Sequence, residues 1–159
     1  MEVLYPRCCG IDVHKRFLVA CLRIAGADGQ ACTTVRRFTT MTDDLLALAD
    51  WLTQEGCTHV AMESTGVYWK PVYNILEDQL EVLVVNAAHM QAVPGRKTDV
   101  NDATWIADLL AHGLLRASFI PDKPHRELRE LVRYRMALVH ERTNEANRLQ
   151  KVLEGGNIT

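Results

Sequence analysis

The sequence predicts an α/β protein with a mixed five-stranded sheet and helices on both of its faces, followed by a long coiled-coil helix. Three observations support this fold class. Short apolar or β-branched segments alternate with helical patterns over the first 120 residues, as is typical of α/β domains. The first three of these segments follow one another with no helix between them, which indicates an antiparallel meander. Between Pro124 and Gly155, no glycine or proline interrupts a charged helical pattern.

Three strands form the first part of the predicted sheet. Cys8–Val13 is short and apolar, while Arg16–Ile24 and Ala31–Thr39 are rich in β-branched and aromatic residues, which favour strands. A turn at Gly26–Gly29 joins the last two. Leucines and alanines at helical spacing then predict a helix that begins at Thr42 and ends before Gly56.

Strands and helices alternate in the next part of the chain. We expect strands at Thr58–Met62 and Glu81–Val85, and helices at Val67–Gln79 and, after a loop, Asp99–His112. Three antiparallel strands would thus precede two parallel ones. This order is that of a ribonuclease H-like sheet, which we expect to occupy residues 1–120.

Residues 121–159 are expected to form the coiled-coil helix. One column of apolar residues recurs every seven positions, with Leu131 and Leu138 beside it, whereas Arg135 and Arg142 interrupt the seam. The pattern favours a short coiled coil or a helical hairpin over a surface helix, and hence a homodimer or higher oligomer formed through residues 125–154. The column consists of Val132, Val139, Ala146 and Leu153.

Composition narrows the class of protein without identifying it. The chain has 159 residues and a net charge of −2, but the segment from Arg116 to Lys151 is basic, which is compatible with nucleic acid without requiring it. The five cysteines show no CxxC spacing, so we expect them to be reduced and buried in a cytoplasmic protein. No apolar run is long enough to span a membrane.

Four acidic residues occur where a strand ends or a helix begins: Asp12, Glu63, Asp99 and Asp102. Each has an ordinary explanation, because Asp is common in turns and acids are favoured in the first turn of a helix. Taken together, however, they would converge at one edge of the predicted sheet. Clustered carboxylates repel one another unless cations lie between them.

The four carboxylates therefore predict a site for divalent metal, where two Mg²⁺ ions about 4 Å apart would hold a phosphodiester and a nucleophile in line. Lys15, Arg96 and Lys97 flank the acids and would suit a nucleic-acid backbone, although they are equally consistent with solvated surface charges. For His14, an orienting or structural role is favoured over general acid–base catalysis.

Several motifs resemble the amino-terminal half of insertion-sequence transposases of the DEDD type, the IS110 family. They are GIDVHK, MESTGVYWKP, VVNAAHMQAVPGRKTDVNDATWIADLLAHGLL and LRELVRYRMALVHERTNEANRLQ. The resemblance extends from about Cys9 to Asn157, and the KTDVNDA-type stretch is its most specific part.

This resemblance implies a RuvC-like catalytic domain of ribonuclease H-like fold, a coiled coil and a carboxy-terminal transposase domain. Carried over by position, the catalytic and metal-binding residues would be Asp12, Glu63, Asp99 and Asp102. Mg²⁺ would be the metal and Mn²⁺ a possible substitute. The resemblance also implies DNA transposition and recombination, binding to DNA and to a structured bridge RNA, and a bacterial cytoplasmic location close to the nucleoid.

In that family a serine of the carboxy-terminal domain is thought to be the nucleophile, and this chain ends where that domain should begin. Its serines, Ser64 and Ser118, do not suit the role. We therefore expect an amino-terminal portion that does not complete recombination alone. The alternative is a module that binds guide RNA or DNA and dimerises without catalysis. A sugar-kinase-like ATPase is disfavoured, because Val13-His14-Lys15 lacks the small residues that a phosphate would approach.

Overall fold

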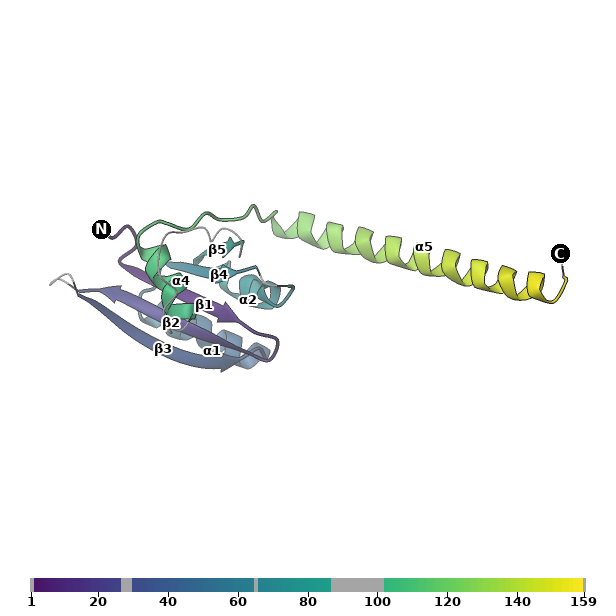
Figure 1. Ribbon diagram of the computed structural model, residues 1–159. Helices are drawn as coiled ribbons and strands as arrows, with labels where there is room; N and C mark the ends of the chain where they lie inside the picture. The colour runs from purple at the N-terminus through teal and green to yellow at the C-terminus, as the bar shows by residue number, and fades with distance from the viewer. Residues whose placement is uncertain (1, 27–29, 65, 87–101, 159) are drawn as a thin grey trace. The chain divides into compact units, whose positions relative to one another are not determined.

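A computed structural model describes residues 2–26, 30–64, 66–86 and 102–158. The chain divides into two compact units, residues 1–118 and residues 119–159. Among the described residues, the first unit contains the sheet with three helices, and the second contains one long helix (Figure 1).

A mixed five-stranded sheet forms the centre of the first unit. Its strands lie in the order β3-β2-β1-β4-β5; β1, β2 and β3 are antiparallel to one another, and β4 and β5 run parallel to β1. This order confirms the predicted ribonuclease H-like arrangement. The strands are β1 (Arg7–Val13), β2 (Phe17–Ala25), β3 (Ala31–Thr39), β4 (His59–Glu63) and β5 (Glu81–Val85).

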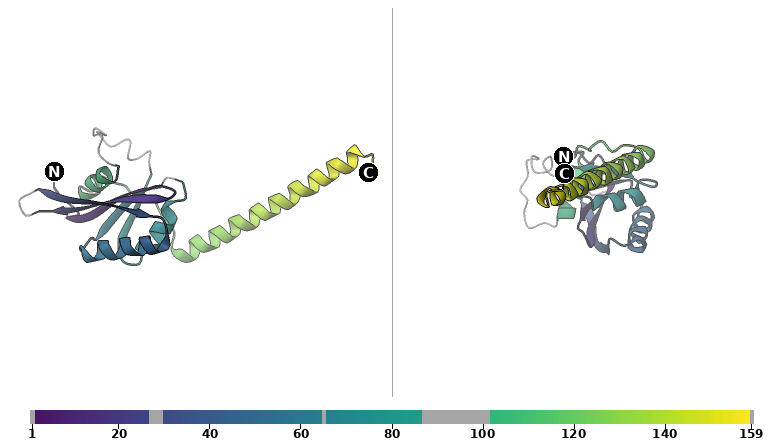
Figure 2. Two further views of the ribbon diagram at one scale, coloured as in Figure 1. Left: turned by 90° about the horizontal axis from the view of Figure 1, so that it is seen from below. Right: turned by 90° about the vertical axis from the view of Figure 1, so that its right-hand side faces the viewer.

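Helices cover both faces of this sheet (Figure 2). α1 (Thr42–Gln54) and α2 (Trp69–Leu76) lie on one face, and α4 (Asp102–Ala111) lies on the other. The described part of α4 begins at Asp102; the expected start at Asp99 lies outside the described residues. α2 is shorter than predicted at both ends, because residues 66–68 and 77–79 form turns.

The core is apolar on both sides of the sheet. Ile11, Leu18 and Leu22 are buried on the face that carries α1 and α2, where Leu48 and Leu52 of α1 are fully enclosed. These leucines share one face of α1, and their burial is what the helical spacing predicts. On the opposite face, α4 contributes three residues to a buried cluster that consists of Cys8, Ala61, Ile106, Leu110 and Ala111.

The cysteines are free thiols, as predicted, but one of them is not buried. Cys8, Cys9, Cys21 and Cys57 are enclosed in the first unit, whereas Cys32 is exposed. The prediction was wrong for Cys32 because β3 is an edge strand that is exposed along most of its length. An apolar or β-branched strand pattern does not reveal which strand lies at the edge of the sheet.

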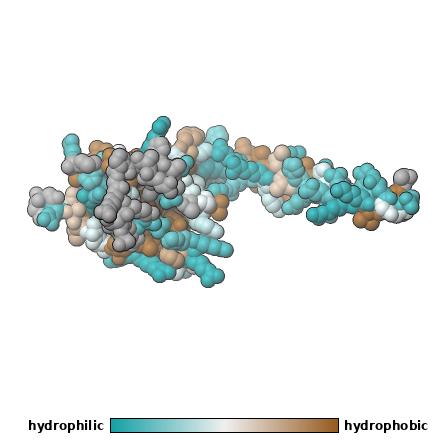
Figure 3. All heavy atoms as spheres, viewed as in Figure 1, coloured by the Kyte–Doolittle hydropathy of each residue, from teal (hydrophilic) through white to brown (hydrophobic). Residues whose placement is uncertain are grey.

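The second unit contains α5 (Lys123–Gly155), a helix of 33 residues and therefore about 50 Å long. Pro124 lies in its first turn, a position where the missing N–H costs nothing. No residue of α5 is buried, and apolar side chains alternate with hydrophilic ones along it (Figure 3). Among the described residues, no helix is long and apolar enough to cross a membrane.

Candidate catalytic site at the ends of β1 and β4

Two of the predicted acids lie at the carboxyl ends of adjacent parallel strands. β1 and β4 are paired up to Ile11 and Met62, and the next residues along the two strands are Asp12 and Glu63. Neighbouring strands are about 4.8 Å apart, and side chains alternate between the faces of a sheet. Asp12 and Glu63 therefore share the face opposite to Ile11 and Met62.

α4 packs against this same face at very close range. A Cβ atom placed on Gly10 would lie 2.2 Å from the carbonyl oxygen of Ala103 and 2.3 Å from the backbone nitrogen of Ala107. Only a glycine in β1, together with small residues on the helix, permits this approach. Gly10 is two residues before Asp12 and on the same face, while Ala103 directly follows Asp102. The contact thus brings the amino-terminal end of α4 to the acids of the strands.

The electrostatics of Asp12 reflect the other two carboxylates. Burial raises the pKa of Asp12 above its ordinary value, the nearby His14 opposes this increase, and Asp102 and Glu63 add to it. Like charges raise a carboxyl pKa only when they are close, because the interaction falls with distance and is screened by water. Asp12, Glu63 and Asp102 thus form one electrostatic group that draws on β1, β4 and α4.

His14 completes the immediate surroundings of Asp12. Its Nε2 atom lies 3.0 Å from Oδ2 of Asp12, and its ring centroid lies 4.5 Å from that of Phe17 at an interplanar angle of 41°. The Asp12 side chain is 21% exposed, so the carboxylate is still accessible from solvent. This geometry agrees with an orienting role for His14.

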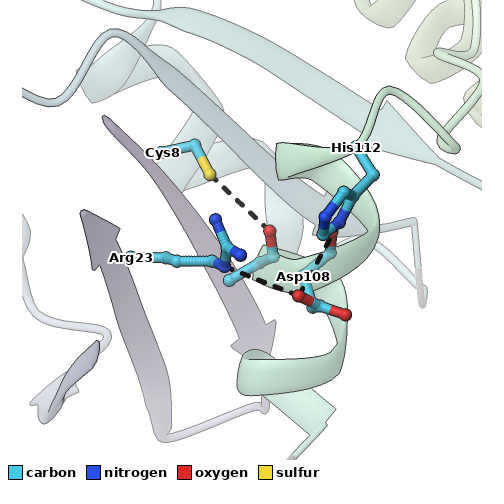
Figure 4. Close-up of polar contacts among 5 residues, drawn as sticks. Cys8, Arg23, Asp108 and His112 are labelled. Carbon is cyan, nitrogen blue, oxygen red and sulfur yellow. Dashed lines mark hydrogen bonds and ion pairs between the residues drawn. The ribbon is translucent and has the colours of Figure 1, made fainter. Parts of the chain in front are cut away.

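Polar contacts hold the other end of α4 to the sheet (Figure 4). The Sγ atom of Cys8 donates to the Ala107 carbonyl over 3.6 Å, and Nε of Arg23 lies 3.5 Å from Oδ1 of Asp108. Nδ1 of His112 lies 2.8 Å from the Asp108 carbonyl oxygen. The contacts of Cys8 and Arg23, with the packing at Gly10, fix the position of the helix and hence that of Asp102, while the His112 contact lies within the end of α4 itself.

The structure describes only part of the predicted site. Glu63 and Asp102 lie close enough to act electrostatically on Asp12, and Lys15 lies in the turn that follows β1. Asp99, Arg96 and Lys97 lie outside the described residues. Within the described ranges, no three His, Cys, Asp or Glu side chains are grouped to hold a metal ion. Carboxylate oxygens are nevertheless the ligands that Mg²⁺ prefers. A bound cation would also relieve the repulsion that Glu63 and Asp102 exert on Asp12.

The residues that position the site were not predicted from the sequence. Gly10, Ala103 and Ala107 carry no reactive groups, yet they determine how closely α4 approaches β1. A signal for this contact was present, because an isolated glycine in an apolar strand often marks a close approach of another backbone. Two alanines four residues apart on the helix that packs there, α4, provide the matching small surface.

A family model for transposases, the DEDD type of the IS110 group, matches residues 9–158. No curated protein is significantly similar to the chain in sequence.

Solved structures with similar chains include two of Thermus thermophilus RuvC. One is a complex with a Holliday junction substrate, with a TM-score of 0.46 and 13% identity over 70% of this chain and 99% of that chain. The other has a TM-score of 0.41 and 16% identity over 72% and 84%. The Fowlpox virus Holliday junction resolvase has a TM-score of 0.40 and 15% identity over 69% and 93%. The strand order, and not these scores, is the basis of the fold assignment.

Proposed function

The chain belongs to the IS110-type family of DEDD transposases, and from this membership we propose that its first unit is the metal-dependent catalytic domain of a DNA transposase. The reaction would be phosphoryl transfer during DNA strand cleavage and joining. The observation that supports this proposal is the group formed by Asp12, Glu63 and Asp102, in which carboxylates from three distant segments interact.

The proposed metal ligands are these three acids and Asp99, with Mg²⁺ as the cofactor and Mn²⁺ as a substitute. When bound, the metal would act as a Lewis acid on a phosphate oxygen and lower the pKa of a bound nucleophile. The chain's own contribution is positional: β1 and β4 present Asp12 and Glu63 side by side. The close packing at Gly10 holds the amino-terminal end of α4 against β1, which supports Asp102 as a further ligand.

Nucleic acid is the proposed partner of this site. Lys15 lies two residues after Val13, the last residue of β1, in the turn next to His14, where its ammonium group would contact a phosphate of the DNA backbone. Arg96 and Lys97 are proposed to do the same. We also propose a structured bridge RNA as a partner, on the basis of the family resemblance alone.

A second candidate function is supported by α5. This helix has no buried residue, and apolar side chains such as Leu131 and Val132 are more than half exposed. A module that binds guide RNA or DNA and dimerises through this helix, without chemistry of its own, would have these properties.

Cleavage of branched or nicked DNA in Mg²⁺ or Mn²⁺ tests the catalytic proposal. We expect the wild-type chain to cut and Asp12→Asn to lose at least about a hundredfold in rate, the scale of losing a charge that holds the metal. Asp50→Asn, which changes an exposed acid of α1 on the opposite face of the sheet, should cut normally. Binding without cleavage by the wild type, in either metal, would instead support the binding and assembly module.

A further inference from the structure

A pocket of about 750 Å³ lies beside the acid group, where the turn between β1 and β2 meets the end of β3 and the start of α1. It contains three cationic side chains and one carboxylate. Of its residues, the catalytic proposal uses only His14 and Lys15, and the sequence predicted only Lys15 as a phosphate contact. The lining residues are His14, Lys15, Arg16, Phe17, Arg37, Phe38, Thr39 and Asp44.

The strand register relates this pocket to the catalytic acids. Asp12 of β1 is paired with Val19 of β2, which is paired with Arg37 of β3. Residues paired across strands share a face of the sheet, and this face carries α4, because Val19 packs against Ala103 and Ala107. Two strand spacings separate Asp12 from Arg37, which is about 10 Å. A single DNA strand carries a phosphate at every nucleotide, so one strand could contact both residues within a few nucleotides.

Aromatic stacking holds the Arg37 guanidinium in place. Its Cζ atom lies 3.8 Å from the centroid of the Phe17 ring. Stacking involves the face of the guanidinium and leaves its in-plane N–H groups with the fork geometry that suits a phosphate. A side chain that is already ordered loses less entropy when it binds.

The turn that carries Lys15 and Arg16 is also fixed. It is a two-residue turn closed by the His14 N–H, which donates to the Phe17 carbonyl over 2.9 Å. Thr40, directly after β3, donates to both turn carbonyls: its N–H to Arg16 over 3.3 Å and its hydroxyl to Lys15 over 3.0 Å. The two cationic side chains therefore leave a turn that is tied to the end of β3.

The pocket's single carboxylate does not neutralise it. Oδ2 of Asp44 accepts hydrogen bonds from the Thr39 N–H at 2.8 Å and from the Thr39 hydroxyl at 2.6 Å. These bonds lower the pKa of Asp44, so it remains an anion that ties the start of α1 to the end of β3. The pocket also contains three exposed cationic side chains, so its net charge is positive. They are Lys15, Arg16 and Arg37.

We propose that this pocket binds the phosphodiester backbone of the DNA strand that enters the acid group, with Arg37 contacting a phosphate a few nucleotides from the reacting one. Lys15 and Arg16 contact the phosphates between them. The inference rests on the proposed function, since it takes DNA as the substrate. It adds Arg16 and Arg37 as contacts and Phe17 as the residue that positions Arg37.

Arg36 provides a matched control for Arg37. It is the adjacent residue of the same edge strand, it is exposed, and its Cζ lies 4.5 Å from the centroid of the Trp51 ring. Trp51 belongs to α1, so Arg36 lies on the opposite face of the sheet. Arg36→Ala and Arg37→Ala therefore remove the same charge and the same kind of stacking, but from different faces.

The test is binding of a fluorescently labelled single-stranded DNA of about 20 nucleotides, titrated with salt in the presence of Ca²⁺ to neutralise the acids. One lost phosphate contact lowers the slope of log K against log salt by about 0.7, which is about fivefold in affinity at about 0.1 M salt. We expect this loss for Arg37→Ala and wild-type binding for Arg36→Ala. Phe17→Leu, which keeps the charge but removes the ring, should lose less than Arg37→Ala. Thermal unfolding checks that all three variants are folded.

The outcomes separate this inference from the proposed function. Equal losses of DNA affinity for Arg36→Ala and Arg37→Ala, or no loss for either, would contradict the proposed role of the pocket while leaving DNA as the substrate. Failure of the wild-type chain to bind DNA at low salt would count against both. An Arg37-dependent loss seen with an RNA of the same sequence but not with DNA would assign the pocket to RNA and overturn the inference as stated.

Discussion

At Gly10, the absence of a side chain lets the backbone of α4 approach the backbone of β1. The position has no chemistry of its own, but it determines where the first residue of the described helix, Asp102, lies relative to Asp12. Protein interiors are packed too densely to absorb an added group without movement. The geometry of the acid group therefore depends on a residue that carries no charge.

We expect Gly10→Ala to destabilise the protein by about 1–3 kcal/mol or more, because the new Cβ atom overlaps backbone atoms that cannot rotate away. Chemical denaturation measures this loss. Gly155→Ala is the control: a Cβ atom there meets nothing within 4 Å, and alanine favours the helix. Equal stability of the two variants would show that α4 does not pack against β1 in this way.

Divalent metal should stabilise the folded chain, because Glu63 and Asp102 both repel a negative charge on Asp12 and a ligand that binds only the native state raises the melting temperature. We expect the melting temperature to rise with added Mn²⁺, less so in Asp102→Asn, and normally in Asp50→Asn, which changes an exposed acid of α1. Differential scanning fluorimetry measures the response. An unchanged melting curve at Mn²⁺ concentrations well above millimolar would contradict the metal site.

The buried thiols predict a loss of stability at alkaline pH. Burial raises the pKa of Cys57 to about 12 and that of Cys8 to about 11, from 9.0. The unfolded thiols release protons first, so their contribution is present below pH 9 and declines as the pH rises from 9 towards 11 or 12. The free energy of unfolding, measured by denaturant from about pH 8 to about pH 11, should fall over this range. Cys57→Ala should reduce the pH dependence, and an unchanged dependence in this variant would contradict the assignment.

At the scale of elements, local patterns predicted nearly all of the strands and helices. Ala31–Thr39 and Glu81–Val85 have the predicted bounds, because alternation, β-branched residues and flanking turns are local properties. The parallel pairing of β1 and β4 followed from the order of the elements. The cross-strand row of Asp12, Val19 and Arg37 could not be predicted from the order of the elements, because strand register depends on contacts between segments that are distant in sequence.

The long helix α5 presents an apolar stripe that has no cover in its own unit. Leu138 is 47% and Val139 38% exposed, and a stripe of this kind is normally a contact surface. The predicted cover is the same helix of a second chain, antiparallel or crossing about a two-fold axis. Arg135 and Arg142 interrupt the seam, so the pairing should be of moderate strength.

Replacing Leu138 and Val139 together with Asp should therefore produce monomers, because charges would enter the seam. Light scattering at high micromolar concentration measures the mass. Asn144→Asp combined with Asn147→Asp adds the same charge at positions outside the apolar columns and should leave the oligomer intact. A wild-type chain that is monomeric at this concentration would contradict the coiled coil.

At the scale of the whole molecule, the buried apolar residues of the described ranges all lie in the first unit. They extend from Cys8 to Ala111, and α5 contributes none. Burial of apolar surface is the main source of folding free energy. We therefore expect the first unit to fold without the second. The first unit would hold the fold and the acid group, and the second would hold the association surface.

A chain that ends at Ser118 tests this division. Its last residue is tied to the sheet, since the Ser118 N–H donates to the Val84 carbonyl over 2.8 Å. We expect its melting temperature to lie within about 2 °C of that of the full chain, a change of about 0.5 kcal/mol for a domain of this size. It should retain the Mn²⁺ response and be monomeric. A decrease of more than about 5 °C would show that α5 contributes to the stability of the sheet, because the loss of surface residues alone costs far less.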